Sequence, residues 1–258
     1  MLRFRNLGSG SSGNATIVEA SSGCGSTRLL VDCGLGVRQL EQRLAHCGLA
    51  SSDIDAIFIT HEHADHIGCA RSLALRGRIP VWMSPGTYAA IGSPDMEGLL
   101  REAGDGTAIA LQDLSLLPFT VPHDAREPLQ LRCSDGDRTL GILTDLGHAT
   151  AHVLKSLRQC HALLLEFNHD SDLLARSSYH PSLKKRVGGK YGHLSNDAAA
   201  SLATALDHAG LATVVAAHLS RQNNLPELVR VALGHALNRE PASIPVADPV
   251  TGTDWLTV

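Results

Sequence analysis

The stretch Thr60-His61-Glu62-His63-Ala64-Asp65-His66-Ile67-Gly68 places three imidazoles and a carboxylate within six residues, directly after an apolar segment. Alternate residues of an extended segment point the same way, so His61 and His63 share one side, and Asp65 and His66 follow as the chain turns. Imidazole and carboxylate are metal ligands, and one ion could not easily take all four side chains from so short a loop. The spacing therefore predicts two ions, one on His61 and His63 and the other on Asp65 and His66. A solvated loop that caps the next helix would not need this density of ligands.

The composition limits the classes of protein to consider. The 258 residues are 43% hydrophobic and 3% aromatic, which predicts a core of Leu, Val, Ile and Ala. A net charge of -4 argues against a broadly basic surface that coats nucleic acid but leaves room for a local basic patch. No apolar run reaches membrane-spanning length, and the first residues lack a signal peptide, so we expect a cytoplasmic protein. Scattered cysteines without a C-x-x-C pair predict reduced thiols at Cys24, Cys33, Cys47, Cys69, Cys133 and Cys160.

Short strands and helices alternate along the chain. The predicted strands are Ala15–Glu19, Arg28–Asp32, Ala56–Thr60, Ile79–Met83, Leu114–Val121, Leu129–Cys133, Thr139–Thr144, Ala162–Phe167 and Val214–Ala217. The predicted helices are Gly36–Gly48, Ile67–Arg76, Pro94–Ala103, Ala151–Leu157, Ala198–Ala209 and Pro226–Asn238. The loop Gly8–Asn14 is rich in Gly and Ser but leads into a strand, which favours a turn near a site over a nucleotide-binding loop. Residues 1–258 are therefore expected to form one domain, a sandwich of sheets covered by helices.

The order His-x-His-x-Asp-His after an apolar strand resembles the signature of the metallo-β-lactamase fold. That family is of the α/β class, an αββα sandwich in which two mixed sheets are covered by helices. The resemblance implies further ligands at strand ends for two divalent ions, Zn²⁺ or Mn²⁺: His123 would join His61 and His63, His218 would join Asp65 and His66, and Asp145 would bridge both. Asp32 matches the structural aspartate that the family keeps beside its metals.

The second half of the chain resembles nucleases of this fold. Leu165–Asp170 and Gly192–Asn196 are similar to motifs of ribonuclease Z, and segments along nearly the whole chain are similar to the YycJ/WalJ-type branch of 5′-exonuclease-like DNA hydrolases. The resemblance implies a dinuclear phosphodiesterase on nucleic acid, with DNA favoured over RNA. Glu166 would orient His193, and His193 would protonate the leaving oxygen, a role that His169 could share. Asp65 would serve as a ligand and proton acceptor.

A basic run, Leu183–Gly192, precedes His193 and adds candidate substrate contacts. Arginine binds phosphate through two nitrogens and lysine as a point charge, so Lys184 and Arg186 are expected near phosphate, although a solvated face explains the run equally well. The remaining candidate contacts are His169, Ser195, Arg221 and Asn223. A loop that caps the following helix is an equal explanation for Asn223. The competing functions are a thioesterase-like or other small-molecule metallo-hydrolase, and a regulatory protein with a structural metal.

Overall fold

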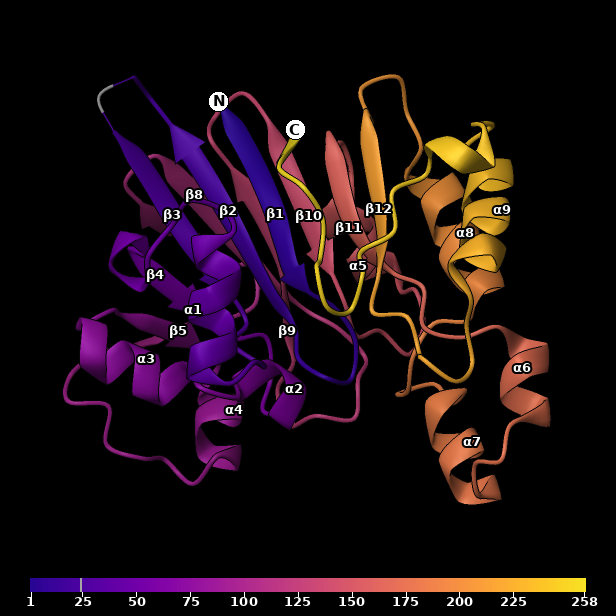
Figure 1. Cartoon of the computed structure of the whole chain (residues 1–258), viewed down its shortest axis with the longest axis horizontal. Coiled ribbons are helices and arrows are strands. Elements are labelled where there is room, and N and C mark those ends of the chain that lie inside the picture. The colour runs from indigo at the N-terminus through magenta and orange to yellow at the C-terminus, as the bar shows by residue number, and fades with distance from the viewer. Residues whose placement is uncertain (24) are drawn as a thin grey trace.

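Two mixed β-sheets pack face to face in the computed structural model, which describes residues 1–23 and 25–258 (Figure 1). The first sheet has the order β13 (Leu256–Thr257), β1 (Leu2–Gly8), β2 (Ala15–Ser21), β3 (Ser26–Val31), β4 (Ala56–Phe58), β5 (Val81–Met83) and β6 (Leu100–Glu102). The second has the order β12 (Thr213–Ala217), β11 (Ala162–Glu166), β10 (Thr139–Leu143), β9 (Leu129–Ser134), β8 (Leu114–Thr120) and β7 (Ile109–Leu111). Strands β3 to β6 are parallel to one another, as are β10 to β12.

Helices cover the outer faces of both sheets, as Figure 1 shows. On the first half they are α1 (Val37–Ala45), α2 (Ala64–Ile67), α3 (Ala70–Gly77) and α4 (Pro85–Ala90). On the second half, α5 (Ala151–Leu157), α8 (Asn196–Leu206) and α9 (Pro226–Ala236) pack on the sheet, whereas α6 (Ser171–Arg176) and α7 (Pro181–Val187) lie away from its outer face. This is the predicted αββα sandwich.

Three apolar layers hold the sandwich together, because each sheet buries both of its faces. Phe4, Phe58 and Leu131 belong to the layer between the two sheets. A second layer joins the first sheet to the outer helices, with Leu40 of α1 and Leu73 of α3, and a third joins the second sheet to α5, α8 and α9. The strands carry near-continuous apolar runs for this reason, and their polar residues follow at the strand ends.

The helix predicted over Pro94–Ala103 is wrong. That segment contains Glu97 and Gly98, both at positive φ (49° and 77°), and then β6. The helix lies earlier, at α4, where the Ser84 side chain accepts a hydrogen bond from Thr87 N and a proline occupies the first turn. The helix predicted over Ile67–Arg76 is divided into α2 and α3 at Gly68, whose φ is 27°.

The described cysteines Cys33, Cys47, Cys69, Cys133 and Cys160 are free thiols. The prediction for Cys24 lies outside the described residues. Within residues 1–23 and 25–258, every helix is too short or too polar to cross a membrane.

A buried carboxylate on the first sheet leads to a stability prediction. Glu19, on β2, is 1% exposed and accepts hydrogen bonds from Arg3 of β1 and Arg28 of β3, each at 2.6 Å. Burial alone would raise the pKa of Glu19, but the two arginines outweigh it and lower the pKa below 4.5. A pKa lower in the folded than in the unfolded state stabilises the fold above the unfolded pKa, and this stability is lost as the pH falls through the folded value. Glu19→Gln should therefore reduce the free energy of unfolding by about 1–3 kcal/mol at neutral pH.

Urea unfolding of wild type and Glu19→Gln at pH 7 and below pH 4 measures this effect. The difference between the two proteins should shrink at the acidic pH, because protonation removes the Glu19 charge from wild type. Glu97→Gln is the matched control, because the Arg78–Glu97 pair is exposed and should contribute less than about 1 kcal/mol. An equal loss in both variants, or a loss independent of pH, would contradict the argument.

Candidate metal centre

The predicted ligands meet at one edge of the sandwich, where strands of both sheets end. His61 follows β4, His123 follows β8, Asp145 follows β10 and His218 follows β12 directly. The carboxyl ends of neighbouring parallel strands lie at the same edge of a sheet, so residues far apart in sequence come together there. Five of the seven predicted ligand side chains are buried: His61, His66, His123, Asp145 and His218. This edge is the candidate metal centre.

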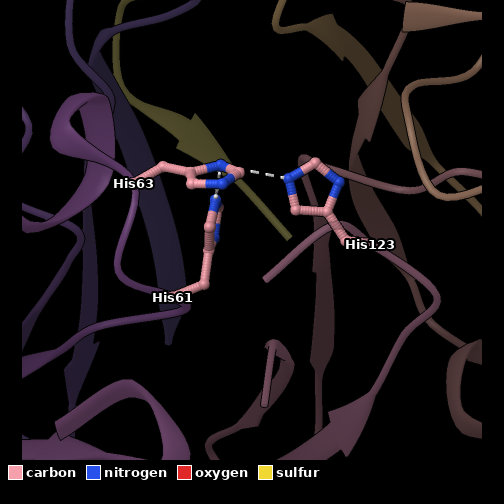
Figure 2. A group of neighbouring side chains, drawn as sticks. All are labelled: His61, His63 and His123. Atoms are coloured by element: carbon pink, nitrogen blue, oxygen red, sulfur yellow. Dashed lines mark hydrogen bonds between the residues drawn. The ribbon is translucent and has the colours of Figure 1, made fainter. Parts of the chain in front are cut away.

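Three imidazoles form the first group of ligands (Figure 2). His61 Nε2 lies 3.0 Å from His63 Nδ1, and His123 Nε2 lies 3.3 Å from the same His63 atom. His61 and His63 come from the loop after β4, and His123 reaches toward them from the second sheet. One nitrogen of each ring therefore faces a common point, the arrangement predicted for the first ion.

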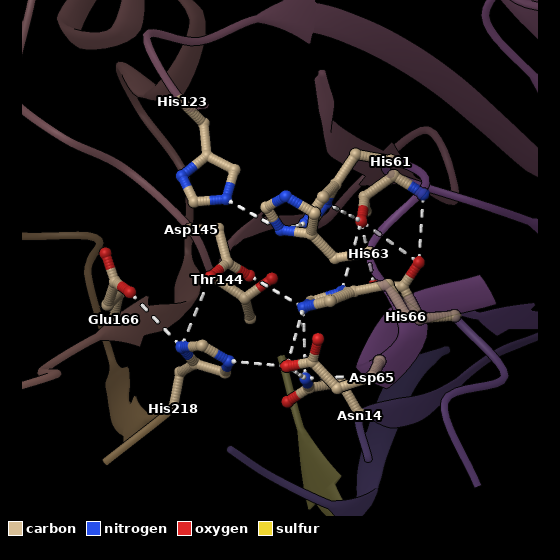
Figure 3. Close-up of polar contacts among 12 residues, drawn as sticks. Asn14, His61, His63, Asp65, His66, His123, Thr144, Asp145, Glu166 and His218 are labelled. Carbon is tan, nitrogen blue, oxygen red and sulfur yellow. Dashed lines mark hydrogen bonds and ion pairs between the residues drawn. The ribbon is translucent and has the colours of Figure 1, made fainter. Parts of the chain in front are cut away.

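A mixed group of ligands lies beside the first (Figure 3). Asp65 Oδ2 is 3.6 Å from both His66 Nε2 and His218 Nε2. Asp145 stands between the groups, with Oδ2 2.8 Å from His66 Nε2 and Oδ1 3.3 Å from His218 Nδ1. Asp145 and His66 also approach His61 closely enough for the three to share one ion. The geometry thus brings together the two predicted ligand sets, with the predicted bridging carboxylate between them.

The outer nitrogens of these rings are held by neighbours, which leaves the inner nitrogens directed at the centre. His61 Nδ1 lies 3.0 Å from Thr60 Oγ1, His123 Nδ1 3.0 Å from the Gly192 carbonyl and His218 Nδ1 3.2 Å from Glu166 Oε1. Such partners orient metal-binding imidazoles. Within the described part of the chain, His218 Nε2 at the centre is buried and has no hydrogen-bond partner. Orphaned buried donors and acceptors are costly, so the donor set fits divalent metal ions.

Asp32 supports the centre from behind. Its Oδ1 accepts hydrogen bonds from Thr60 N and Oγ1, and its Oδ2 lies 2.8 Å from His66 Nδ1. Asp32 itself has a φ of 61°, a left-handed conformation that a non-glycine residue adopts only when its surroundings enforce it. This position matches the supporting role predicted from the sequence.

Asp32→Asn should weaken metal binding without unfolding the protein. The amide retains the size of the side chain but removes the negative charge that orients and polarises His66. Loss of such a partner lowers metal affinity by about 10–100-fold. Competition with a graded chelator, followed by elemental analysis, measures the change, and the exposed Asp172→Asn provides a control of the same chemistry. Equal affinities in the two variants would contradict the role of Asp32.

Two glycines allow the metal-ligand loop to lie directly on the first sheet. A Cβ on Gly34 would come 1.7 Å from the Asp65 carbonyl oxygen, and a Cβ on Gly68 would come 2.3 Å from that of Cys33. Hydrogen bonds use this close approach: Cys33 N donates to the His66 carbonyl and Asn14 N to that of Asp65, at 2.8 Å each. The backbone of the ligand loop is therefore fixed by neighbouring segments.

The cluster combines opposite charges at short range. Burial lowers the pKa of His66, but the charges of Asp145 and Asp32 outweigh it and raise that pKa well above its ordinary value. Burial acts on His218 in the same way, yet Asp145, Asp65 and Glu166 raise its pKa to about 9. Burial would raise the pKa of Asp65, whereas the neighbouring His218 and His66 lower it to about 2. Metal ions bind neutral imidazole, so their binding to this cluster should release protons.

His193 and Glu166 form a pair at the same edge. His193 Nδ1 lies 2.7 Å from Glu166 Oε1 and 3.1 Å from Asp145 Oδ1. Glu166 is fully buried and its Oε2 accepts hydrogen bonds from Leu146 N and Leu194 N, so the carboxylate is clamped. Burial opposes a proton on His193, but Glu166 and Asp145 raise its pKa well above the ordinary value. The pairing predicted from the sequence is present, and the ring can hold a proton beside the ligands.

A cavity of about 350 Å³ opens over the ligands. Its walls include His63, Asp65, Asp145, His193 and His218 from the cluster, and Arg186 from α7. Arg186 also donates from Nε to Asp124, which lies 3.5 Å from His123 Nε2. Residues of both ligand groups and His193 are therefore open to a molecule in the cavity.

The other predicted substrate contacts are placed in different ways. Arg221 is exposed at a neighbouring pocket, whereas Lys184 Nζ donates to the Ala175 carbonyl and does not line the metal cavity. Ser195 caps α8 by accepting from Ala198 N. His169 is 4% exposed and lines neither pocket, and Asn223 is fully buried with its Nδ2 on Ser220 Oγ, in the loop that leads to α9. Only Arg186 and Arg221 of the six therefore lie on these pocket walls, among the described residues.

Three residues at the centre had no predicted role, although Thr60 begins the histidine-rich stretch, and Ser9 and Asn14 belong to the loop predicted to be a turn near a site. Asn14 Nδ2 lies 3.1 Å from the Asp65 carbonyl and 3.0 Å from His66 Nε2. Thr60 Oγ1 connects Asp32 with two of the imidazoles, and Ser9 Oγ accepts a hydrogen bond from His218 N at 2.7 Å. These contacts join segments far apart in the chain, which spacing alone does not reveal.

Comparison with known proteins shows which family and which proteins the chain is similar to. Residues 27–219 match the model of the Beta-lactamase superfamily domain. The chain is 31% identical to Exodeoxyribonuclease YycJ of Bacillus anthracis over 98% of this chain and 96% of that protein. It is 31% identical to Exodeoxyribonuclease WalJ of Streptococcus pneumoniae serotype 2 over 91% and 88%. The crystal structure of the metallo-beta-lactamase fold protein YhfI from Bacillus subtilis shares the fold, with a TM-score of 0.76, 15% identity and coverage of 99% and 98%.

Proposed function

The chain belongs to the metallo-β-lactamase superfamily and is a metal-dependent hydrolase, and we propose that its substrate is nucleic acid. In this proposal it is a dinuclear phosphodiesterase, a DNA exonuclease that acts from the 5′ end. The observation that carries the proposal is the clamped His193–Glu166 pair beside the seven ligands. The near full-length similarity to two named exodeoxyribonucleases supports DNA as the substrate.

The paired His193 is suited to the proton that phosphodiester hydrolysis requires. The reaction forms a P–O bond from water and breaks the P–O bond to the leaving sugar oxygen, which then needs a proton. Glu166 accepts the Nδ1–H of His193, which fixes the ring and leaves Nε2–H to donate to the leaving oxygen. In the proposal Asp65, which lines the metal cavity, accepts the proton that water loses.

Two divalent ions, Zn²⁺ or Mn²⁺, would supply what these side chains cannot, namely a lowered water pKa and positive charge for the phosphate oxygens. In the proposal His61, His63 and His123 hold one ion, Asp65, His66 and His218 the other, and Asp145 both. Arg186 would bind a phosphate oxygen at the cavity wall.

Digestion of end-labelled nucleic acid tests the proposal. Protein stripped with a chelator is loaded separately with Zn²⁺ or Mn²⁺, its metal content is measured, and it is given 5′- or 3′-labelled DNA and RNA in single- and double-stranded form. We expect release of labelled mononucleotides from 5′-labelled DNA with at least one of the metals. Failure to cleave any phosphodiester, together with turnover of acyl thioesters, would overturn the proposal in favour of a thioesterase.

A further inference from the structure

Two pockets meet beside the metal centre. One is the metal cavity described above, and the other is a pocket of about 240 Å³ lined by residues 9–12 and 219–222. Ser11 and Tyr179 line both pockets, so the two hollows adjoin at these side chains. Ser11 belongs to the loop between β1 and β2, and Tyr179 to the loop between α6 and α7. A ligand held in the metal cavity can therefore extend into the second pocket past Ser11 and Tyr179.

The second pocket has the chemistry of a site for an anion. Its lining contains the guanidinium of Arg221 and no carboxylate, among the residues that the structure describes. Arg221 is exposed and makes no ion pair within the described part of the chain, so its donors are free for a ligand. The side chains of Ser11 and Ser12 are exposed beside it. Guanidinium and hydroxyl donors around a small pocket suit a phosphate oxygen.

Tyr179 gives the junction a flat aromatic face. The side chain is half-buried, and its hydroxyl forms no hydrogen bond with the described residues, so hydrogen bonding does not explain the position of the ring. Aromatic side chains in nucleic-acid sites stack on bases, and such stacking tolerates any base because every base has a π face. Drug-sized ligands occupy pockets of about 300–1,000 Å³, so a volume of about 240 Å³ suits a single nucleoside unit.

We propose that the second pocket binds the nucleotide next to the scissile phosphate, with its base stacked on Tyr179 and its outer phosphate on Arg221. This inference rests on the proposed function and specifies the substrate further. The nucleotide that enters must be unpaired, because a base stacked on Tyr179 inside a pocket of this size cannot remain in a duplex. The protein would thus require a single-stranded or frayed end.

An abasic-site scan tests the role of Tyr179. Single-stranded oligodeoxynucleotides carry one abasic residue, placed on either side of the first scissile bond, and kcat/KM is measured for the metal-loaded enzyme. Wild type should lose about tenfold on one side only, the side on which the base enters the second pocket. On the natural oligonucleotide, Tyr179→Ala should have a kcat/KM about tenfold below that of wild type. The abasic residue should cause no further fall in the kcat/KM of this variant. Tyr179→Phe should behave as wild type, because stacking does not need the hydroxyl.

Tyr191 provides a matched control. It is 61% exposed and lines neither pocket, so Tyr191→Ala should retain the ratio of natural to abasic kcat/KM. A ratio that Tyr179→Ala leaves at the wild-type value, or that Tyr191→Ala changes equally, would overturn the inference.

A binding measurement separates this inference from the proposed function. An oligodeoxynucleotide with 2-aminopurine at the scanned position loses fluorescence when that base stacks. Wild type and Tyr179→Phe should quench the fluorescence, and Tyr179→Ala should not. Absence of turnover in wild type would contradict the proposed function. Equal quenching by wild type and Tyr179→Ala, or no quenching by either protein, would contradict the base site.

Discussion

Asp65→Ala should reduce phosphodiester hydrolysis by about 10³-fold or more while the protein stays folded. The carboxylate lies 3.6 Å from both His66 Nε2 and His218 Nε2, and it is the negatively charged ligand that the second ion does not share with the first. Its removal leaves two imidazoles and the shared Asp145 for the second ion and also removes the proposed proton acceptor. The measurement is kcat on bis-p-nitrophenyl phosphate and on labelled DNA, with elemental analysis of bound metal.

A companion variant and a control sharpen this test. His63→Ala removes a ligand from the first group and should abolish hydrolysis as well. His152→Ala removes an imidazole that is exposed and pairs with Asp105, so it should retain activity. If all three variants unfold near the wild-type melting temperature, the loss of activity comes from the missing side chain and not from unfolding. Full activity in Asp65→Ala or His63→Ala would refute the assignment of the centre.

His193→Ala should lower kcat on DNA by about 10²–10⁴-fold without loss of metal, which is the range for removal of a general acid. The loss should depend on the leaving group. A sugar oxygen is strongly basic and needs a proton, whereas p-nitrophenolate leaves readily without one. The fall in kcat should therefore be much smaller on bis-p-nitrophenyl phosphate than on DNA.

The position of His193 also allows a competing role, which the same variant distinguishes. His193 lies in a group with Asp145, Glu166 and His218 that could itself hold an ion. Loss of metal in His193→Ala, with equal loss of kcat on both substrates, would make it a ligand and refute the acid. Glu166→Gln should follow the leaving-group pattern of His193→Ala. His148→Ala, an exposed imidazole on the Lys190 carbonyl, should match wild type.

Local pattern predicted much of the fold because the buried strands carry nearly uninterrupted apolar runs. Strands β4, β10 and β12 and the polar residues that follow them were recognised in this way. Helices α6 and α7 were missed because α6 buries only Leu174 and α7 buries no residue, so both lack the apolar spacing that indicated α5. A helix was predicted at Pro94–Ala103, but the turns at positive φ in this segment prevent it despite the helix propensity of its residues. That residues 1–258 form one domain, and that the protein is cytoplasmic, stay predictions.

The sequence indicated the candidate site only in part, because the order of residues along the chain does not show where their side chains point. The dense histidine loop indicated metal by itself, whereas His123, Asp145 and His218 were found through the resemblance to a family. Side-chain direction explains the remainder: Arg186 lines the metal cavity, and Lys184, two residues earlier on the same helix, does not. Tyr179 went unnoticed because a single tyrosine between two short helices carries no pattern.

The close approach of Gly34 to the ligand loop has a consequence for metal exchange. The Asp65 and His66 carbonyls accept hydrogen bonds from Asn14 and Cys33, and Gly34 N donates to the Asn14 carbonyl, so this backbone is ordered by protein contacts alone. The conformational entropy of arranging the loop is then lost when the chain folds and not when ions bind. Ions should therefore bind and dissociate reversibly while the loop keeps its conformation. The protein could then exchange one metal for another, as supply changes, without unfolding.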